Sequence, residues 1–243
     1  MKIERSIRTG GRLCRILLSD EPQALLEAYA SGRAVVGVEA GGDPWRFKGI
    51  PYVIPEFKDG EDWLLERILR RHLGLPWIIT STDRLLIREL VPSDVFRITE
   101  PVDPIFSNTA RLTDYIKNQY GFYEYGIWAL VRREDGALAG LGGLKNPELP
   151  QELWHCLTPE RTWLELGYHI FTPWRRRGYA SEAAQAICAY SHEELSACTC
   201  ALIRAENNAS RQVAEGIGMK LMRPEGQKEL SADSEHLLYV RCC

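Results

Sequence analysis

Three consecutive arginines open a helix-like stretch in the segment PWRRRGYASEAAQ. A helix begins with backbone N–H groups that lack partners and with partial positive charge, so further positive charge there is unfavourable unless an anion binds. Gly178 has no side chain and Ala180 has a small one, which allows an anion to approach the backbone closely. The stretch therefore predicts an anion site whose size suits a diphosphate, with Arg175 to Arg177 around it.

The same residues would also occur in a surface helix whose arginines are merely solvated, so that alternative stays open here.

The motifs of other nucleotide and metal sites are missing. The GxxxxGK[ST] loop and the GxGxxG fingerprint of the best-known nucleotide sites are both absent. The five histidines are scattered without an HExxH pair, and no CxxC pair occurs, so we expect no metal.

The seven cysteines do not suggest a disulfide framework. Their number is odd and their spacing matches no known pattern of bridges. Cys198 and Cys200 stand two residues apart in a predicted strand, where they would face the same side. We therefore expect both to be free thiols in the core rather than redox groups.

Composition places the chain among ordinary soluble proteins. It is 45% hydrophobic and 26% charged, with a formal net charge of −3. This balance disfavours nucleic acid as a ligand, including RNA contacts by the arginine run. No apolar run reaches the roughly 20 residues that span a bilayer, and the N-terminus lacks the apolar core of a signal peptide. We expect a cytoplasmic protein without a membrane partner.

The elements that would position the anion site form the second of two predicted domains, 1–80 and 81–243. The first reads as a small α/β module: a strand at 13–18, a helix at 22–32, a strand at 34–40, and a helix at 60–77. In the second, the arginine loop joins a strand at 162–171 to a helix from about 179. Its other expected elements are strands at 83–90, 198–205 and 236–242, helices at 92–100, 111–121 and 209–218, and a hairpin at 126–144.

Three motifs of the second domain occur together in one family. RRRGYA fits the pattern R/Q-x-x-G-x-G/A, ENNASRQVAEGIGMK fits E-N-x-x-S followed by a helix, and DRLLIREL matches the usual first strand. In the order and spacing that they have along the chain, with DRLLIREL first, they resemble the GNAT acetyltransferase superfamily, and LELGYHIFTPWRRRGYASEA is similar to the branch with the ribosomal-protein N-terminal acetyltransferases. The resemblance covers about 83–243.

This resemblance implies a fold, a cosubstrate and a site. The fold would be an α/β (α+β) structure with a mixed, mostly antiparallel sheet flanked by helices. The strand at 162–171 would part from that at 198–204, and acetyl-CoA would lie in the resulting V. Backbone near Ile170, Phe171 and Thr172 would bind the pantetheine, and Asn207 would both reach it and cap its own helix. The diphosphate would be held by a longer set: Arg175, Arg176, Arg177, Gly178, Tyr179, Ala180 and Ser181.

The implied reaction is attack of an amine on the thioester, which needs a base and is helped by an acid. Glu165 is the base candidate, acting through water; its alternative roles are an ion pair or an anchor for the substrate ammonium. The tyrosine that many family members carry in the helix after the asparagine is missing here, so Ser210 is the acid candidate. Strand alternation would put His169 on the face of Glu165, opposite Tyr168.

The acceptor amine cannot be identified from the sequence. In this fold it would be selected by residues of about 93–125, where DYIKNQYGFYEYG is rich in tyrosine, and by the last strands. A protein N-terminus and a small amine both remain open, as does a non-catalytic acetyl-CoA sensor. The sequence also leaves open what residues 1–80 do and whether the protein forms a homodimer.

Overall fold

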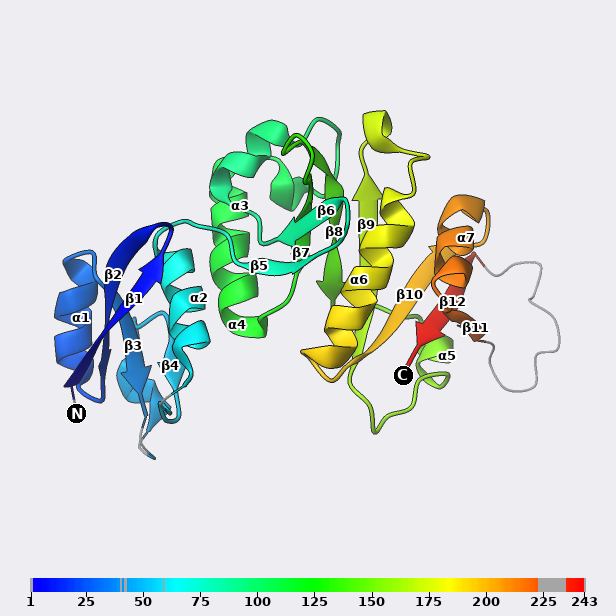
Figure 1. The fold of residues 1–243 in the computed structure, drawn as a ribbon. Helices are drawn as coiled ribbons and strands as arrows, with labels where there is room; N and C mark the ends of the chain where they lie inside the picture. Colours follow the sequence, from blue (N-terminus) through cyan, green and yellow to red (C-terminus); the bar gives the residue numbers. More distant parts are fainter. Residues whose placement is uncertain (1, 40, 42, 59, 223–234, 243) are drawn as a thin grey trace. The chain divides into compact units, whose positions relative to one another are not determined.

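A computed structural model describes residues 2–39, 41, 43–58, 60–222 and 235–242. The chain divides into two units, Met1–Trp77 and Ile78–Cys243. Figure 1 shows the elements of both. Within the described residues no helix is long and apolar enough to cross a membrane.

The N-terminal unit is a four-stranded sheet with a helix on each face. Its strands β1 (Lys2–Thr9), β2 (Arg12–Ser19), β3 (Ala34–Val38) and β4 (Val53–Ile54) lie in that order, and all neighbours except β1 and β2 are parallel. Alternate residues of β2 and β3 face α1 (Pro22–Ala30) on one side and α2 (Asp62–His72) on the other. The predicted strands and helices are present, whereas β1 and the 3₁₀ turn η1 (Pro44–Phe47) were not predicted.

The C-terminal unit contains one mixed sheet in the order β11-β12-β10-β9-β8-β7-β6-β5. Only β9 and β10 are parallel neighbours, which confirms the predicted fold class. The strands are β5 (Ile78–Ser81), β6 (Leu85–Arg88), β7 (Ile127–Arg132), β8 (Leu138–Lys145), β9 (Trp163–Ile170), β10 (Cys198–Arg204), β11 (Lys220–Met222) and β12 (His236–Arg241).

Helices cover both faces of this sheet. On one face α6 (Tyr179–Glu193) packs on Trp128 and Leu130, with α7 (Asn208–Gly216) beside it on β10, and on the other the segment from η2 (Pro92–Arg97) to α3 packs on Ala129 and Val131. That second layer contains η3 (Pro104–Phe106), α3 (Thr109–Tyr115), a π turn η4 (Ile116–Tyr120) and α4 (Gly121–Tyr123); α5 (Gln151–Trp154) follows the hairpin. The helix predicted at 92–100 is thus a 3₁₀ helix, and the one predicted at 111–121 is a mixed α and π segment.

The predicted V is present between β9 and β10. They pair only from Trp163 to Glu165 on β9 and from Cys198 to Cys200 on β10. Beyond that point β9 stays paired with β8 as far as Ile170, while β10 stays paired with β12 as far as Arg204. Each strand follows its outer partner, and the inner edge of each is left without a ladder.

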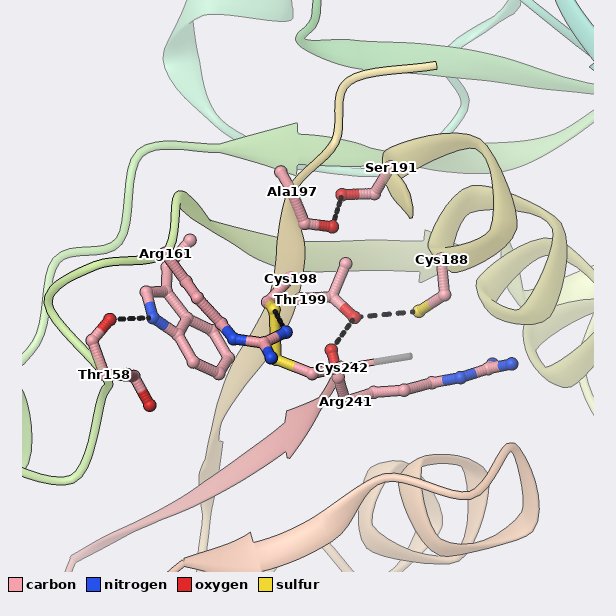
Figure 2. Close-up of a disulfide and its surroundings, with 10 residues drawn as sticks. Thr158, Arg161, Cys188, Ser191, Ala197, Cys198, Thr199, Arg241 and Cys242 are labelled. Carbon is pink, nitrogen blue, oxygen red and sulfur yellow. Dashed lines mark hydrogen bonds between the residues drawn. A yellow bond between two sulfur atoms is a disulfide. The ribbon is translucent and has the colours of Figure 1, made fainter. Parts of the chain in front are cut away.

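Cys198 is not the free core thiol that we expected. It forms a disulfide with Cys242, at a Cα–Cα distance of 4.8 Å, as Figure 2 shows. The antiparallel pairing of β10 with β12 brings together two cysteines that are 44 residues apart in the sequence, which their spacing could not reveal. Cys200 is a buried thiol as expected, and burial together with the nearby Glu165 carboxylate raises its pKa to about 12. Cys243 lies outside the described residues.

A buried ion pair fixes the chain where it leaves β6 for the second layer. Arg88 binds Asp94 through two hydrogen bonds of 2.7 and 2.8 Å, and both side chains are buried. Asp94 also accepts hydrogen bonds from the Val91 amide, at 2.9 Å, and from Arg97, at 3.1 Å. Burial raises the pKa of Asp94, but these donors outweigh it and hold the pKa below its usual 3.8.

We expect Asp94→Asn to destabilise the C-terminal unit by about 3–5 kcal/mol, because it leaves the buried Arg88 charge uncompensated. Urea unfolding of the full chain, followed by tryptophan fluorescence, measures the change. Asp114→Asn removes an exposed carboxylate of the same unit and should stay within about 0.5 kcal/mol of the wild type. Equal midpoints for the two variants would contradict the structural role of this pair.

Candidate functional site

A cavity of about 670 Å³ lies beside the V. Its walls come from the second half of β9, the loop and first turn that begin α6, and the first turns of α7. Most residues predicted to bind a cosubstrate line it: Ile170, Arg175, Arg176, Gly178, Tyr179, Ala180, Ser181 and Asn207. The fold thus brings Ile170 and Asn207, which are 37 positions apart in the chain, to the same cavity.

The arginine loop presents its backbone N–H groups to a ligand. After the 3₁₀ turn η5 (Thr172–Trp174), Arg176 and Gly178 both have positive φ, at 60° and 80°. Positive φ is costly for arginine, and such strain collects where a loop geometry serves a ligand. Within the described part of the chain, the amides of residues 176–181 have no hydrogen-bond acceptor. Unpaired amides at a helix start, with arginines beside them, are the arrangement with which proteins bind anions.

Side chains outside the loop hold it in shape. Arg84 donates from Nη1 to the Arg177 carbonyl at 2.8 Å and from Nε to Glu182 at 2.7 Å, and so ties the loop to the start of α6. The guanidinium groups of Arg132 and Arg177 both lie against the Trp174 ring, at 4.2 and 5.2 Å from its centroid. These contacts occupy Arg177, which does not line the cavity, and leave Arg176 free to meet an anion.

Two more of the predicted residues are engaged within the protein. The Phe171 side chain is buried in the core, and its amide donates to the Ala139 carbonyl at 2.9 Å. The Thr172 amide donates to the Glu100 carboxylate. Since amides alternate along a strand, Ile170 directs its own N–H toward the V.

Asn207 and Ser210 meet at the start of α7, and both line the cavity. The Asn207 side chain accepts the Ser210 amide at 3.1 Å, as a helix N-cap does. This contact uses only the amide oxygen of Asn207. Its NH₂ group is still able to reach a ligand, so the two predicted roles are compatible.

Glu165 lies at the apex of the V, where β9 and β10 still pair. It is not among the residues that line the cavity. Its buried carboxylate lies 3.4 Å from the Lys145 ammonium and accepts the Glu148 amide at 3.3 Å. These contacts match the ion pair that the sequence left open as an alternative to the base.

His169 has a partner that the sequence did not indicate. Its Nε2 lies 3.0 Å from a Glu100 carboxylate oxygen, and Arg175 Nη2 lies 3.2 Å from the same oxygen. Hydrogen bonds from Thr172 and from His169, with the charge of Arg175, lower the pKa of Glu100 to about 2. Glu100 follows η2, some 70 residues before its partners, and no local pattern marks it.

A second cavity, of about 330 Å³, lies on the opposite face of the sheet from α6. Its lining is mostly apolar, with Phe106, Leu141 and Leu144, and its polar rim includes Asp103 and Lys145. Tyr168 and His169 line both this cavity and the first. The strand β9 therefore separates two cavities that meet at these two residues.

Comparison with known proteins assigns this architecture. Residues 79–220, more than half of the chain, match the family model described as the acetyltransferase (GNAT) domain. The chain belongs to the GNAT acetyltransferase family. The predicted resemblance is confirmed, and acetyl transfer is the chemistry of this family.

Solved structures of GNAT acetyltransferases are similar to this chain. One from Bordetella pertussis has 20% identity and a TM-score of 0.50, and the match covers 67% of this chain and 98% of that one. A ribosomal-protein-S5-alanine acetyltransferase from Vibrio fischeri has 13% identity and a TM-score of 0.49, covering 67% and 94%. A ribosomal L7/L12 α-N-acetyltransferase in complex with coenzyme A has 15% identity and a TM-score of 0.49, covering 68% and 97%.

The depressed pKa of Glu100 gives this GNAT domain a testable pH response. A carboxyl whose pKa is lower in the folded than in the unfolded chain stabilises the fold above its unfolded pKa, and this contribution is lost as the pH falls through the folded pKa. Glu100→Gln should therefore lower the urea midpoint at pH 7, and the difference from wild type should shrink between about pH 4.5 and pH 2. Glu160→Gln, which removes an exposed carboxylate, should show no such convergence; parallel behaviour of the two would contradict the assignment.

Proposed function

We propose that the chain binds acetyl-CoA in the V and transfers its acetyl group to a primary amine by direct attack on the thioester. The observation that carries this is the row of amides from residue 176 to residue 181, which have no acceptor among the described residues and lie at the edge of the larger cavity. Such a row fits a diphosphate, and the family supplies the chemistry that follows.

The residues of the cavity fit the coenzyme along its length. Arg175 and Arg176 add charge beside the amides, while Ala180 and Gly178 leave room for phosphate oxygens. From there the cavity runs along the free edge of β9, where the Ile170 amide is available, toward the first turn of α7 with Asn207. The bound coenzyme would supply an activated acetyl group, and these residues would hold it in place.

The second cavity is the place that we propose for the acceptor. It lies across β9 from the first, and residues 102–119 form much of it, within the region from which the sequence predicts acceptor selection. Its apolar walls suit an amine with an apolar body. The similar L7/L12 structure is named as an α-N-protein acetyltransferase. A protein N-terminus and a small amine are both proposed acceptors.

For Glu165 the contacts favour a role as an ion pair at the apex, although its role as base stays a prediction. Holding Lys145 and the Glu148 amide, it would fix the point where β9 and β10 diverge. Ser210 lines the cavity. We propose that its hydroxyl passes a proton to the leaving thiolate.

We expect Arg176→Ala to raise the Kd for coenzyme A about tenfold, since a hydrogen bond to a charged group contributes roughly 1.5–3 kcal/mol. Its side chain is exposed and forms no hydrogen bond or ion pair with the described residues, so the fold should be unaffected. Calorimetry with coenzyme A measures the change. Lys117→Ala removes the same charge from an exposed helical position and should leave Kd unchanged.

The same titration tests the whole proposal. Wild-type protein that takes up no coenzyme A at millimolar concentration would overturn it. Uptake without thiol release for any member of a broad panel of amines would instead indicate the non-catalytic sensor.

Glu165→Gln separates its two roles. If Glu165 only holds the apex, we expect the variant to lose about 1–3 kcal/mol of stability and to keep its turnover per folded molecule within tenfold. Thiol release from acetyl-CoA and urea unfolding measure the two quantities. A hundredfold loss of turnover with intact coenzyme affinity would assign Glu165 as the base.

A further inference from the structure

We infer that His169 takes the proton from the acceptor ammonium and that Glu100 is the positioning residue that prepares it. The inference rests on the proposed function, because it names the base of the same reaction. Neither the family match nor the similar structures assign a role to these two residues.

The position of His169 is the first reason. A base must lie within hydrogen-bond reach of the amine at the moment of attack, and the amine must meet the thioester where the two cavities join. Among the described residues only Tyr168 and His169 line both cavities. The His169 side chain is 38% exposed, so it is accessible to a substrate.

The chemistry of these two residues decides between them. Burial raises the pKa of Tyr168 above its usual 10, and the nearby Ser210 hydroxyl only partly opposes that rise, so Tyr168 keeps its proton at neutral pH. A protonated phenol cannot accept a proton from an ammonium. Tyr168 also projects to the α6 face of β9, whereas His169 lies across from Leu141 on the face of the second cavity.

The hydrogen bond to Glu100 prepares the imidazole. Because Glu100 is ionised at any ordinary pH, its oxygen can only accept, and it therefore assigns the proton to Nε2. Nδ1 then carries the free lone pair, and no described residue donates to it. A carboxylate that binds one ring nitrogen of a histidine orients the imidazole and leaves the other nitrogen free to accept a proton. This arrangement activates imidazole as a base.

The other charges around His169 are compatible with this role. Arg175 shares the Glu100 oxygen, 3.2 Å away, and so anchors the carboxylate from the loop side. On the side of the second cavity, Asp103 lies at the rim, and Lys145 is held by Glu165. Asp103 would attract an ammonium toward the junction where Nδ1 is free.

The step balances as follows. His169 Nδ1 takes one proton from the substrate ammonium, the amine nitrogen forms a bond to the acetyl carbon, and the bond from that carbon to sulfur breaks. The amine nitrogen loses a second proton, and this proton ends on the departing sulfur to give the free thiol. His169 gives its proton to solvent, so nothing is oxidised or reduced and no further reactant is needed.

The test is His169→Ala in the full chain, with acetyl-CoA, an accepted amine, and thiol release as the readout. We expect kcat to fall at least about a hundredfold, the Kd for coenzyme A to stay unchanged, and added imidazole to restore turnover saturably. His155→Ala removes an exposed histidine that lines neither cavity and should keep wild-type turnover.

Glu100→Gln tests the positioning role. An amide no longer fixes the Nε2 proton, so kcat should fall while the acid limb of the pH profile of kcat/KM moves. In His169→Ala the same limb should disappear, which loss of structure alone would not produce.

Two results would overturn the inference. One is wild-type turnover by His169→Ala at every pH, and the other is a deficit that imidazole does not relieve and that accompanies lost coenzyme affinity. Either differs from failure of the proposed function, in which the wild type itself takes up no coenzyme or releases no thiol with any amine.

Discussion

The parting of β9 and β10 is the constraint on which the rest of the structure depends. Each strand keeps a complete ladder on its outer side, with β8 and β12, and gives up the inner ladder after three residues. Unpaired strand edges are costly when they are buried, so the gap is stable only as a solvated cleft or a binding site for a polar chain. The disulfide between Cys198 and Cys242 and the Glu165 ion pair both lie at the closed end, where they hold the pairing that remains. The V is therefore open at one end and fixed at the other.

Most of the positive charge around the open end of the V is balanced by contacts within the protein. Arg84, Arg132 and Arg175 are each paired with a carboxylate or stacked on an aromatic ring, which limits their repulsion. Arg176 alone of the loop arginines has no such contact among the described residues, and it takes a strained backbone conformation. A loop fixed in this way has little conformational freedom left to lose, which would lower the entropic cost of binding the proposed anion.

Much of this site could be predicted from the sequence because its parts are local. The glycine and arginines of the loop, the start of α6 and the Asn207 cap act through neighbours within a few residues, and periodicity placed β9, β10 and α7 closely. What escaped prediction depends on contacts between distant segments. Glu100 reaches Thr172 across about 70 residues, Cys198 meets Cys242 through the pairing of β10 with β12, and β5 is a short edge strand whose partner defines it. Phe171 shows the reverse case: it was predicted to bind a ligand through its backbone, but the fold uses its amide in the sheet.

The two faces of β9 divide the chemistry between them. Residues of one parity face α6 and α7, together with the larger cavity, and those of the other parity face the second cavity and the layer from η2 to α4. One side of this strand thus carries the Tyr168 hydroxyl, and the other carries His169 with its Glu100 partner. If acetyl-CoA and the amine occupy the two cavities as proposed, they can meet only where the cavities join, because direct attack needs contact between the amine and the thioester. Among the described residues Tyr168 and His169 alone line both cavities, so these two side chains would surround the reacting atoms.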